Sequence, residues 1–189
     1  MVSLIKKKNS KLIAHEVISL EIEALKLLKK SLNRNFDKAV NAIVNCQSKI
    51  IFCGVGKSGL IASKIASTMS SVGCPAFSLS ANDCLHGDLG SISSKDLLII
   101  ISNSGKSKEL LPIIKFANRN KIKLIGIVSE KNSSLYKGSD IQILLPEVKE
   151  AGLGIVPTSS TSVQLAVGDA LAVSALNKKK FSKYDFSKL

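Results

Sequence analysis

Leu97-Leu98-Ile99-Ile100-Ile101-Ser102-Asn103-Ser104-Gly105 is an unbroken aliphatic run that ends in small polar residues and a glycine. Such a run predicts a strand buried on both faces of a parallel sheet, with a polar turn at its carboxyl end. Apolar residues then recur at helical spacing from Leu110 to Ala117, which places the turn at a helix N-terminus. Unpaired backbone N–H groups and the helix dipole favour an anion there. We therefore predict that the segment from Ser102 to Ser107 binds a phosphate.

A second strand, turn and helix are predicted around Gly54-Val55-Gly56-Lys57-Ser58-Gly59, which follows an apolar run from Lys49 to Cys53. A Walker A loop is excluded by spacing, because it would need a glycine at Ile51. The three glycines match G-x-G-x-x-G, but the next strand, residues 76–79, runs into Ser80 without the acidic residue that binds a ribose. Dinucleotide binding is therefore a weak alternative, and a tight strand-to-helix turn is the simplest explanation of the glycines.

Further apolar runs at residues 123–128 and 141–145 bring the predicted strands to five, alternating with helices. This order indicates an α/β fold with a doubly wound parallel sheet and helices on both faces. Ligands of such sheets bind beyond the carboxyl ends of the strands. At 189 residues, 45% of them hydrophobic, we expect a single domain with N-terminal helices in 1–48, an α/β core in 49–177 and a basic tail in 178–189.

Two helices are expected before the first strand, at about 10–32 and 36–46. The first carries more apolar positions than one core-facing stripe needs, so we expect it to pack against a partner subunit as well.

The formal net charge of +13 is carried by lysines scattered along the chain, with short runs only at Lys6–Lys8 and Lys178–Lys180. Aromatic residues make up 4%, which disfavours nucleic-acid binding and leaves a small anionic substrate as the better interpretation. The four cysteines lack C-x-x-C spacing, so free thiols are expected rather than disulfides or zinc ligands. Without a signal-peptide core or a membrane-length apolar run, we expect a soluble cytoplasmic protein.

Two further polar segments are candidates for the site. His86 lies in a glycine-flanked turn before the central strand, where a structural role is the alternative to a functional one, and His15 lies among helix core positions. Pro157-Thr158-Ser159-Ser160-Thr161 precedes the last long helix and offers both an N-cap and donors for an anion. Capping alone is the alternative for this segment.

Five motifs together resemble the SIS (sugar isomerase) domain of bacterial D-arabinose 5-phosphate isomerases. They are Gly-Val-Gly-Lys-Ser-Gly at 54–59, His-Gly-Asp-Leu-Gly at 86–90, Ser-Asn-Ser-Gly at 102–105, Pro-Thr-Ser-Ser-Thr at 157–161 and Gly-Asp-Ala-Leu-Ala at 168–172. The resemblance implies a flavodoxin-like domain, usually tetrameric, that interconverts D-ribulose 5-phosphate and D-arabinose 5-phosphate. That reaction supplies the precursor of Kdo, a sugar of lipopolysaccharide and of some capsules. The alternative is a sugar-phosphate-binding domain with a sensing role, or an enzyme acting on another phosphosugar.

The resemblance also implies the site residues. Catalytic roles fall on Lys57, His86, Glu109 and Glu150, with Glu109 expected as the proton-transferring base, and no metal or organic cofactor is expected. The substrate and its phosphate are expected to contact Gly56, Ser58, Gly73, Cys74, Ser102, Asn103, Ser104, Gly105, Ser107, Thr158, Ser159, Ser160 and Thr161.

The chain departs from the family pattern at three places. Lys106 stands where an acidic residue is common, and Ser80 stands where some members have a metal-binding histidine, so no zinc is expected. Family members continue beyond the position of Leu189 with a His-Pro-Gly-Gly segment and often two CBS domains, so the chain is expected to be an isolated SIS domain.

Overall fold

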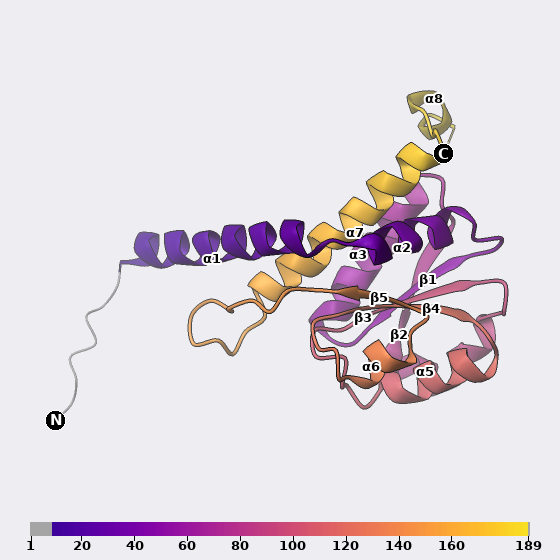
Figure 1. Ribbon diagram of the computed structural model, residues 1–189, viewed down its shortest axis with the longest axis horizontal. Coiled ribbons are helices and arrows are strands. Elements are labelled where there is room, and N and C mark those ends of the chain that lie inside the picture. The colour runs from indigo at the N-terminus through magenta and orange to yellow at the C-terminus, as the bar shows by residue number, and fades with distance from the viewer. Residues whose placement is uncertain (1–8, 189) are drawn as a thin grey trace.

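The computed structural model describes residues 9–188, so the expected basic run Lys6–Lys8 lies outside the described residues. Its centre is a five-stranded, fully parallel sheet with the strand order β2-β1-β3-β4-β5 (Figure 1). The strands are β1 (Ile50–Gly54), β2 (Ala76–Ser80), β3 (Leu97–Ile101), β4 (Lys123–Val128) and β5 (Ile141–Leu144). The chain winds outward from β1 and β3 in two directions, as a doubly wound sheet does. The predicted fold class is confirmed.

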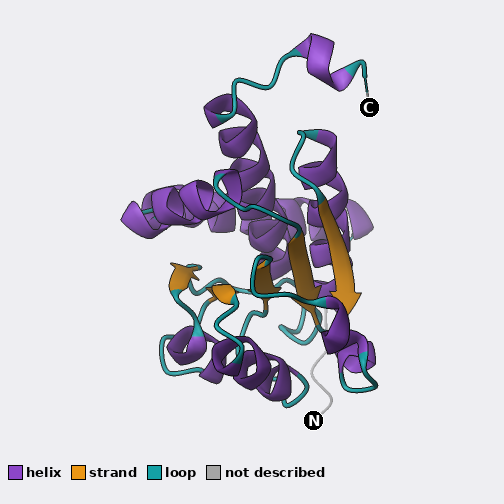
Figure 2. Cartoon of the chain, turned by 90° about the vertical axis from the view of Figure 1, so that its right-hand side faces the viewer, coloured by secondary structure: helices purple, strands orange, loops and turns teal. Residues whose placement is uncertain are grey.

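Helices cover both faces of this sheet (Figure 2). One face packs against α1 (Ser10–Ser31), α2 (Arg34–Val44), α3 (Lys57–Ser71) and α7 (Ser159–Lys178). The other face packs against α4 (Ala81–Cys84), the 3-10 helix η1 (Asp88–Ser91), α5 (Leu110–Arg119) and α6 (Ser134–Gly138). A short helix, α8 (Lys183–Phe186), lies within the basic C-terminal tail.

Strand β3 shows why an uninterrupted aliphatic run is needed at the centre of the sheet. All five of its side chains are buried, between β1 on one side and β4 on the other. Because side chains alternate along a strand, Leu97, Ile99 and Ile101 enter one core while Leu98 and Ile100 enter the other. The prediction of a strand buried on both faces is confirmed.

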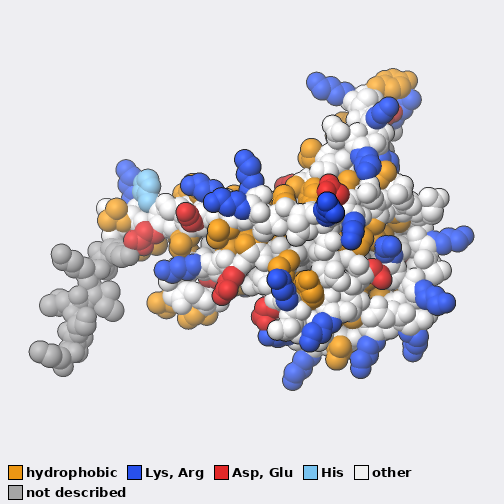
Figure 3. All heavy atoms as spheres, viewed as in Figure 1, with side chains coloured by type: hydrophobic (Ala, Val, Ile, Leu, Met, Phe, Trp, Pro, Cys, Tyr) orange, Lys and Arg blue, Asp and Glu red, His pale blue; other side chains and the backbone are white. Residues whose placement is uncertain are grey.

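Helix α1 is only partly covered by its own chain. Ala24 and Leu28 are buried near α7, whereas the N-terminal half of the helix extends away from the body (Figure 1). Its exposed apolar residues are Leu12, Ile13, Ile18, Ile22, Leu25 and Leu27. Hydrophobic side chains gather along this helix in Figure 3, while Lys and Arg side chains are scattered over the body rather than forming one stripe.

Helices α3 and α7 pack at a glycine. A methyl group added at Gly168 would lie 2.1 Å from Cδ1 of Ile65, so the Ile65 side chain of α3 packs directly against the backbone of α7. Both helices begin at the carboxyl edge of the sheet, α3 directly after β1 and α7 after the long loop that follows β5. Their N-termini therefore converge where ligands of such folds bind.

Candidate functional site

A cavity of about 200 Å³ lies at this carboxyl edge. It is lined by Val55, Lys57, Ser58, Asn103, Glu150, Pro157, Ser160, Thr161 and Gln164. These residues come from the β1–α3 turn, the turn after β3, the β5–α7 loop and the first turns of α7. The structure thus brings together six of the predicted site residues from four separate stretches of sequence: Lys57, Ser58, Asn103, Glu150, Ser160 and Thr161.

The β1–α3 turn is shaped by its glycines. Gly56 has φ 56° and ψ −126°, a backbone conformation that side chains strongly disfavour. A Cβ on Gly54 would lie 2.8 Å from the backbone of Ser58, so the first turn of α3 packs directly on the end of β1. Within residues 9–188 no side chain caps α3 at Gly56. The first N–H groups of α3 and the exposed Lys57 side chain therefore provide positive charge at the cavity.

Glu150 supplies the cap of α7 from within the long loop. Its Oε2 atom accepts hydrogen bonds from the backbone N–H of Thr158 at 2.7 Å, from the Thr158 hydroxyl at 3.1 Å and from the backbone N–H of Ser160 at 3.3 Å. The Thr158 hydroxyl in turn accepts from the backbone N–H of Ala151 at 3.0 Å. The expectation that Thr158 and its neighbours cap α7 through their own side chains is wrong, because Thr158 makes no side-chain cap bond. A carboxylate of the same chain already occupies this helix N-terminus.

These contacts determine the charge of Glu150. Partial burial by itself raises the pKa of this carboxyl group, but the hydrogen bonds from Ser160 and Thr158 outweigh burial and hold the pKa below its ordinary value of 4.5. Glu150 is therefore ionised at neutral pH. It faces the same small cavity as the Lys57 side chain, so the cavity presents one anionic group and one cationic group to a ligand.

The turn after β3 is held by its own hydrogen bonds. The Ser102 hydroxyl, which is buried, accepts from the backbone N–H of Gly105 at 3.0 Å, and Gly105 has φ 64°. The Ser129 hydroxyl donates to the Asn103 carbonyl at 2.6 Å. Helix α5 begins only at Leu110, so the turn does not lie directly at the helix N-terminus as we expected. Of this segment, only Asn103 lines the cavity; Ser104, Gly105 and Ser107 follow it in the same loop.

Besides Thr158 and the rest of the turn after β3, four more predicted residues belong to the same edge of the sheet but do not line the cavity. His86 is exposed between α4 and η1, after the edge strand β2, and its backbone N–H donates to Asp83. Glu109 is half-buried and directly precedes α5. Gly56 forms the turn before Lys57, and Ser159 is fully buried at the start of α7.

Gly73 and Cys74 lie at the opposite, amino edge of the sheet. Helix α3 runs from the carboxyl edge to Ser71, and β2 starts at Ala76, so the residues between them are at the amino ends of the strands. Lys179 donates to the carbonyl of Gly73. Burial raises the pKa of the Cys74 thiol. The structure therefore does not bring these two residues together with Lys57.

A family model described as the SIS domain matches residues 43–174. The chain belongs to the SIS domain family. Arabinose 5-phosphate isomerase KdsD of Yersinia pestis is 42% identical over 173 residues, covering 91% of this chain and 53% of that protein. The protein of the same name from Francisella tularensis is 42% identical over 178 residues, covering 92% and 54%. The chain thus spans about half the length of these curated relatives.

A solved E. coli structure gives the corresponding comparison for the fold. That protein, in complex with arabinose 5-phosphate, superposes on this SIS domain with a TM-score of 0.90 at 34% identity. The similarity covers 96% of this chain and 98% of the E. coli chain.

Three residues lining the cavity of this SIS domain were not predicted from the sequence: Val55, Pro157 and Gln164. Val55 lies in the motif at 54–59 and Pro157 in the motif at 157–161, but only other residues of these motifs were predicted to contact the substrate. Gln164 had a signal, because it follows Ser160 by four positions and so lies on the same helix face. Its polarity within the otherwise apolar stretch from Val163 to Val167 is the feature that points to it.

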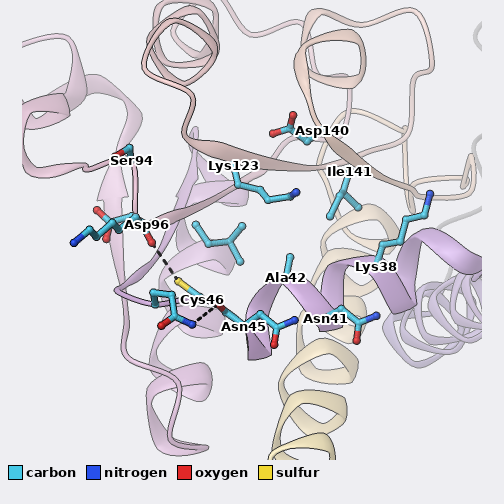
Figure 4. Close-up of a pocket in the computed structure, with 13 residues that line it drawn as sticks. Lys38, Asn41, Ala42, Asn45, Cys46, Ser94, Asp96, Lys123, Asp140 and Ile141 are labelled. Carbon is cyan, nitrogen blue, oxygen red and sulfur yellow. Dashed lines mark hydrogen bonds between the residues drawn. The ribbon is translucent and has the colours of Figure 1, made fainter.

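A larger cavity of about 660 Å³ lies at the amino edge, between α2 and the starts of β3, β4 and β5 (Figure 4). Asp96 and Asp140 at its wall are engaged in the fold: Asp96 accepts from the backbone N–H groups of Lys49 and Ser93, and Asp140 accepts from that of Leu124. We place the functional site of the SIS domain in the smaller cavity instead. The strand ends and two helix N-termini converge there, and the candidate catalytic residues Lys57 and Glu150 both line it.

The four thiols of this SIS domain are free, and Cys53, Cys74 and Cys84 are buried. A hydrogen bond with Cys84 and burial raise the pKa of the Cys53 thiol, which makes it unreactive. Within residues 9–188, no group of three or more His, Cys, Asp or Glu side chains is arranged to hold a metal ion. Across the same range, no helix has both the length and the apolar character needed to span a membrane.

Proposed function

We propose that this SIS domain is an aldose–ketose isomerase that interconverts D-ribulose 5-phosphate and D-arabinose 5-phosphate through an enediolate. The family membership, the name shared by relatives at 42% identity and the bound sugar phosphate of the similar E. coli structure support this proposal. The observation that carries it is the cavity itself, where Lys57 at the start of α3 faces the same space as the ionised Glu150 at the start of α7.

The reaction moves a proton between two adjacent carbons, so negative charge develops on the sugar oxygens. Lys57 and the first N–H groups of α3 lie where they can stabilise that charge. Glu150 acts as a positioning residue, since its carboxylate holds Thr158 and Ser160 and thereby the start of α7. Its lowered pKa makes it a weak base, so proton transfer falls to another group.

For that group we propose Glu109, with His86 as the rival. Both side chains lie at the carboxyl edge, on the loops that follow β3 and β2. We place the phosphate at the Ser102–Ser107 turn. The Thr158 and Ser160 N–H groups already donate to Glu150, so the start of α7 has few donors left for a phosphate. We therefore assign Ser160 and Thr161 to contacts with the sugar instead. The same reaction would supply arabinose 5-phosphate for Kdo synthesis in the cytoplasm, in keeping with the four free thiols.

The decisive measurement is proton exchange in heavy water with D-arabinose 5-phosphate as substrate. An isomerase introduces solvent deuterium at C2 of the aldose, whereas binding without exchange would support a sensing domain instead. Lys57→Met should lower kcat/KM by roughly 10²–10³-fold, because it removes charge opposite the developing oxyanion. Lys64→Met is the matched control, since Lys64 lies on the same helix but pairs with Asp169 outside the cavity.

The assignment of the base has its own test. Glu109→Gln should reduce exchange by roughly 10²–10⁴-fold, the usual loss for a general base. If Glu109→Gln exchanges at nearly the wild-type rate while His86→Asn does not, the base is His86.

We further propose that the SIS domain assembles as a homotetramer through α1. Six apolar side chains of this helix are exposed, and a second copy of the chain would bury them. Sedimentation equilibrium should give a mass near four times 20.1 kDa. A 20.1 kDa species alone at micromolar concentration would contradict the proposal.

A further inference from the structure

Among the described residues that line the cavity, Gln164 alone has a buried polar side chain with an unpaired atom. It lies in the second turn of α7 and lines the cavity together with Lys57, yet only 1% of its surface is exposed. Its Oε1 atom has no hydrogen-bond partner among residues 9–188. A buried carbonyl oxygen without a donor destabilises the ligand-free protein. A side chain that is costly to the fold and placed at a cavity wall indicates a role in binding.

We propose that Gln164 is a specificity-determining residue that hydrogen-bonds a hydroxyl group of the open-chain phosphosugar, an inference that rests on the isomerase function proposed above. The amide oxygen accepts hydrogen bonds and needs a donor. A sugar hydroxyl provides one, whereas an ionised phosphate oxygen only accepts. Gln164 therefore faces the hydroxyl-bearing carbons of the ligand rather than its phosphate.

The neighbouring residues give this contact its direction. Ser160 lies one helical turn before Gln164 and also lines the cavity, and its backbone N–H is bonded to Glu150. Glu150, Ser160 and Gln164 thus form a polar strip along one side of the cavity. Each of them has an oxygen that can accept a hydrogen bond from a hydroxyl group. Such a strip suits a chain of carbons that each carry a hydroxyl group.

The position of Gln164 is fixed by packing. Val163 and Val167, on either side of it along α7, are buried in the core that α7 shares with α3. Because only 1% of the surface of Gln164 is exposed, its side chain has little conformational freedom left to lose when a ligand binds. The structure therefore combines a preorganised amide with an unused acceptor.

Gln164→Met tests the proposal, because methionine keeps the unbranched shape of glutamine and removes both polar atoms. We expect KM for D-ribulose 5-phosphate to rise roughly tenfold, the usual effect of losing one hydrogen bond to a ligand. The thermal midpoint of the ligand-free protein should stay the same or rise, since an unpaired buried oxygen has been removed. A purely structural residue would show a lower midpoint and an unchanged KM.

Gln142→Met is the matched control, with the same chemical change in β5. The Gln142 amide donates to the carbonyl of Ser139 and lies outside the cavity. This variant should lower the thermal midpoint and leave KM unchanged. Gln164→Leu serves as a second variant of the test residue if Gln164→Met does not fold.

Deoxy analogues of ribulose 5-phosphate, each lacking one hydroxyl, identify the partner. By titration calorimetry, one analogue should bind the wild type roughly tenfold more weakly than the parent sugar does. The Gln164→Met variant should bind that analogue and the parent sugar with the same affinity. Equal losses for every analogue in both proteins, together with an unchanged KM, would overturn the inference while leaving the isomerase intact. A wild type that binds the sugar without exchanging deuterium would instead refute the isomerase, and calorimetry would still decide the role of Gln164. No binding of ribulose 5-phosphate by the wild type would overturn both.

Discussion

Replacing Glu150 with glutamine removes the charge that caps α7 while keeping its shape. In the wild type one carboxylate oxygen accepts three hydrogen bonds, two of them from backbone N–H groups at the helix start. Replacing the charged acceptor by a neutral amide oxygen weakens this cap by up to about 1 kcal/mol, and losing the favourable interaction of a negative charge with the helix dipole adds about 0.3–1 kcal/mol. We therefore expect Glu150→Gln to lower the free energy of unfolding by about 1–2 kcal/mol. For a chain of this size that corresponds to a fall in Tm of about 2–8 °C.

The pH dependence of this difference identifies its cause. Because the folded protein holds the pKa of Glu150 below 4.5, the carboxylate contributes its stability fully above pH 4.5. The contribution is lost as the pH falls from 4.5 through the folded pKa. The gap between wild type and Glu150→Gln should therefore be constant from neutral pH down to about pH 5 and close below it.

Urea unfolding followed by circular dichroism at several pH values measures this gap. Glu147→Gln is the matched control, since Glu147 lies in the same loop and is exposed. The control should be indistinguishable from the wild type at every pH. A gap that persists undiminished at pH 3, or is absent at pH 7, would refute the assignment of Glu150 as the cap.

Two further predictions concern the fold around the site. Gly168→Ala should lower the free energy of unfolding by about 1–3 kcal/mol, because the added methyl group would overlap Ile65 and force α3 and α7 apart. Urea unfolding measures this loss, and Ser174→Ala on the same helix is the control. Asp96→Asn should cost about 1–3 kcal/mol at pH 7, because the buried carboxylate accepts from the N–H groups of Lys49 and Ser93. Hydrogen bonds from Ser48, Ser93 and Lys49 outweigh burial and lower its pKa below 3.8, so the loss should vanish only below that pH.

The sheet could be predicted because its signals are local. The aliphatic run of β3 and the glycine turn after β1 each specify their own conformation, and the rules for parallel sheets then place their ends at one edge. The cap on α7 could not be predicted in the same way. It depends on a loop that returns Glu150 to the backbone of Thr158, and nothing in the pattern of the intervening residues marks that closure.

Other differences arise from tertiary structure. The sequence marks Gln164 only as a polar residue in an apolar stretch of α7, whereas its unpaired Oε1 atom becomes known only from the pairing of buried polar atoms in the structure. The segment Gly73–Cys74 illustrates the reverse case. Helix α3 starts at Lys57 and is long enough to carry the chain across the whole sheet to the amino edge. The position of Gly73–Cys74 could therefore have been predicted from the length of this helix.

The layer formed by α4, η1, α5 and α6 contributes none of the nine residues that line the cavity. Those four elements rest on their own hydrophobic core, which the sheet separates from the core beneath α3 and α7. Substitutions in the two layers can therefore serve different purposes in protein engineering. Substitutions that raise heat resistance belong in the buried core of the α5–α6 layer, at positions such as Ile113, Ala117 and Leu135 that lie away from Glu109 and His86 in sequence, whereas libraries that seek a new sugar preference belong in the first two turns of α7.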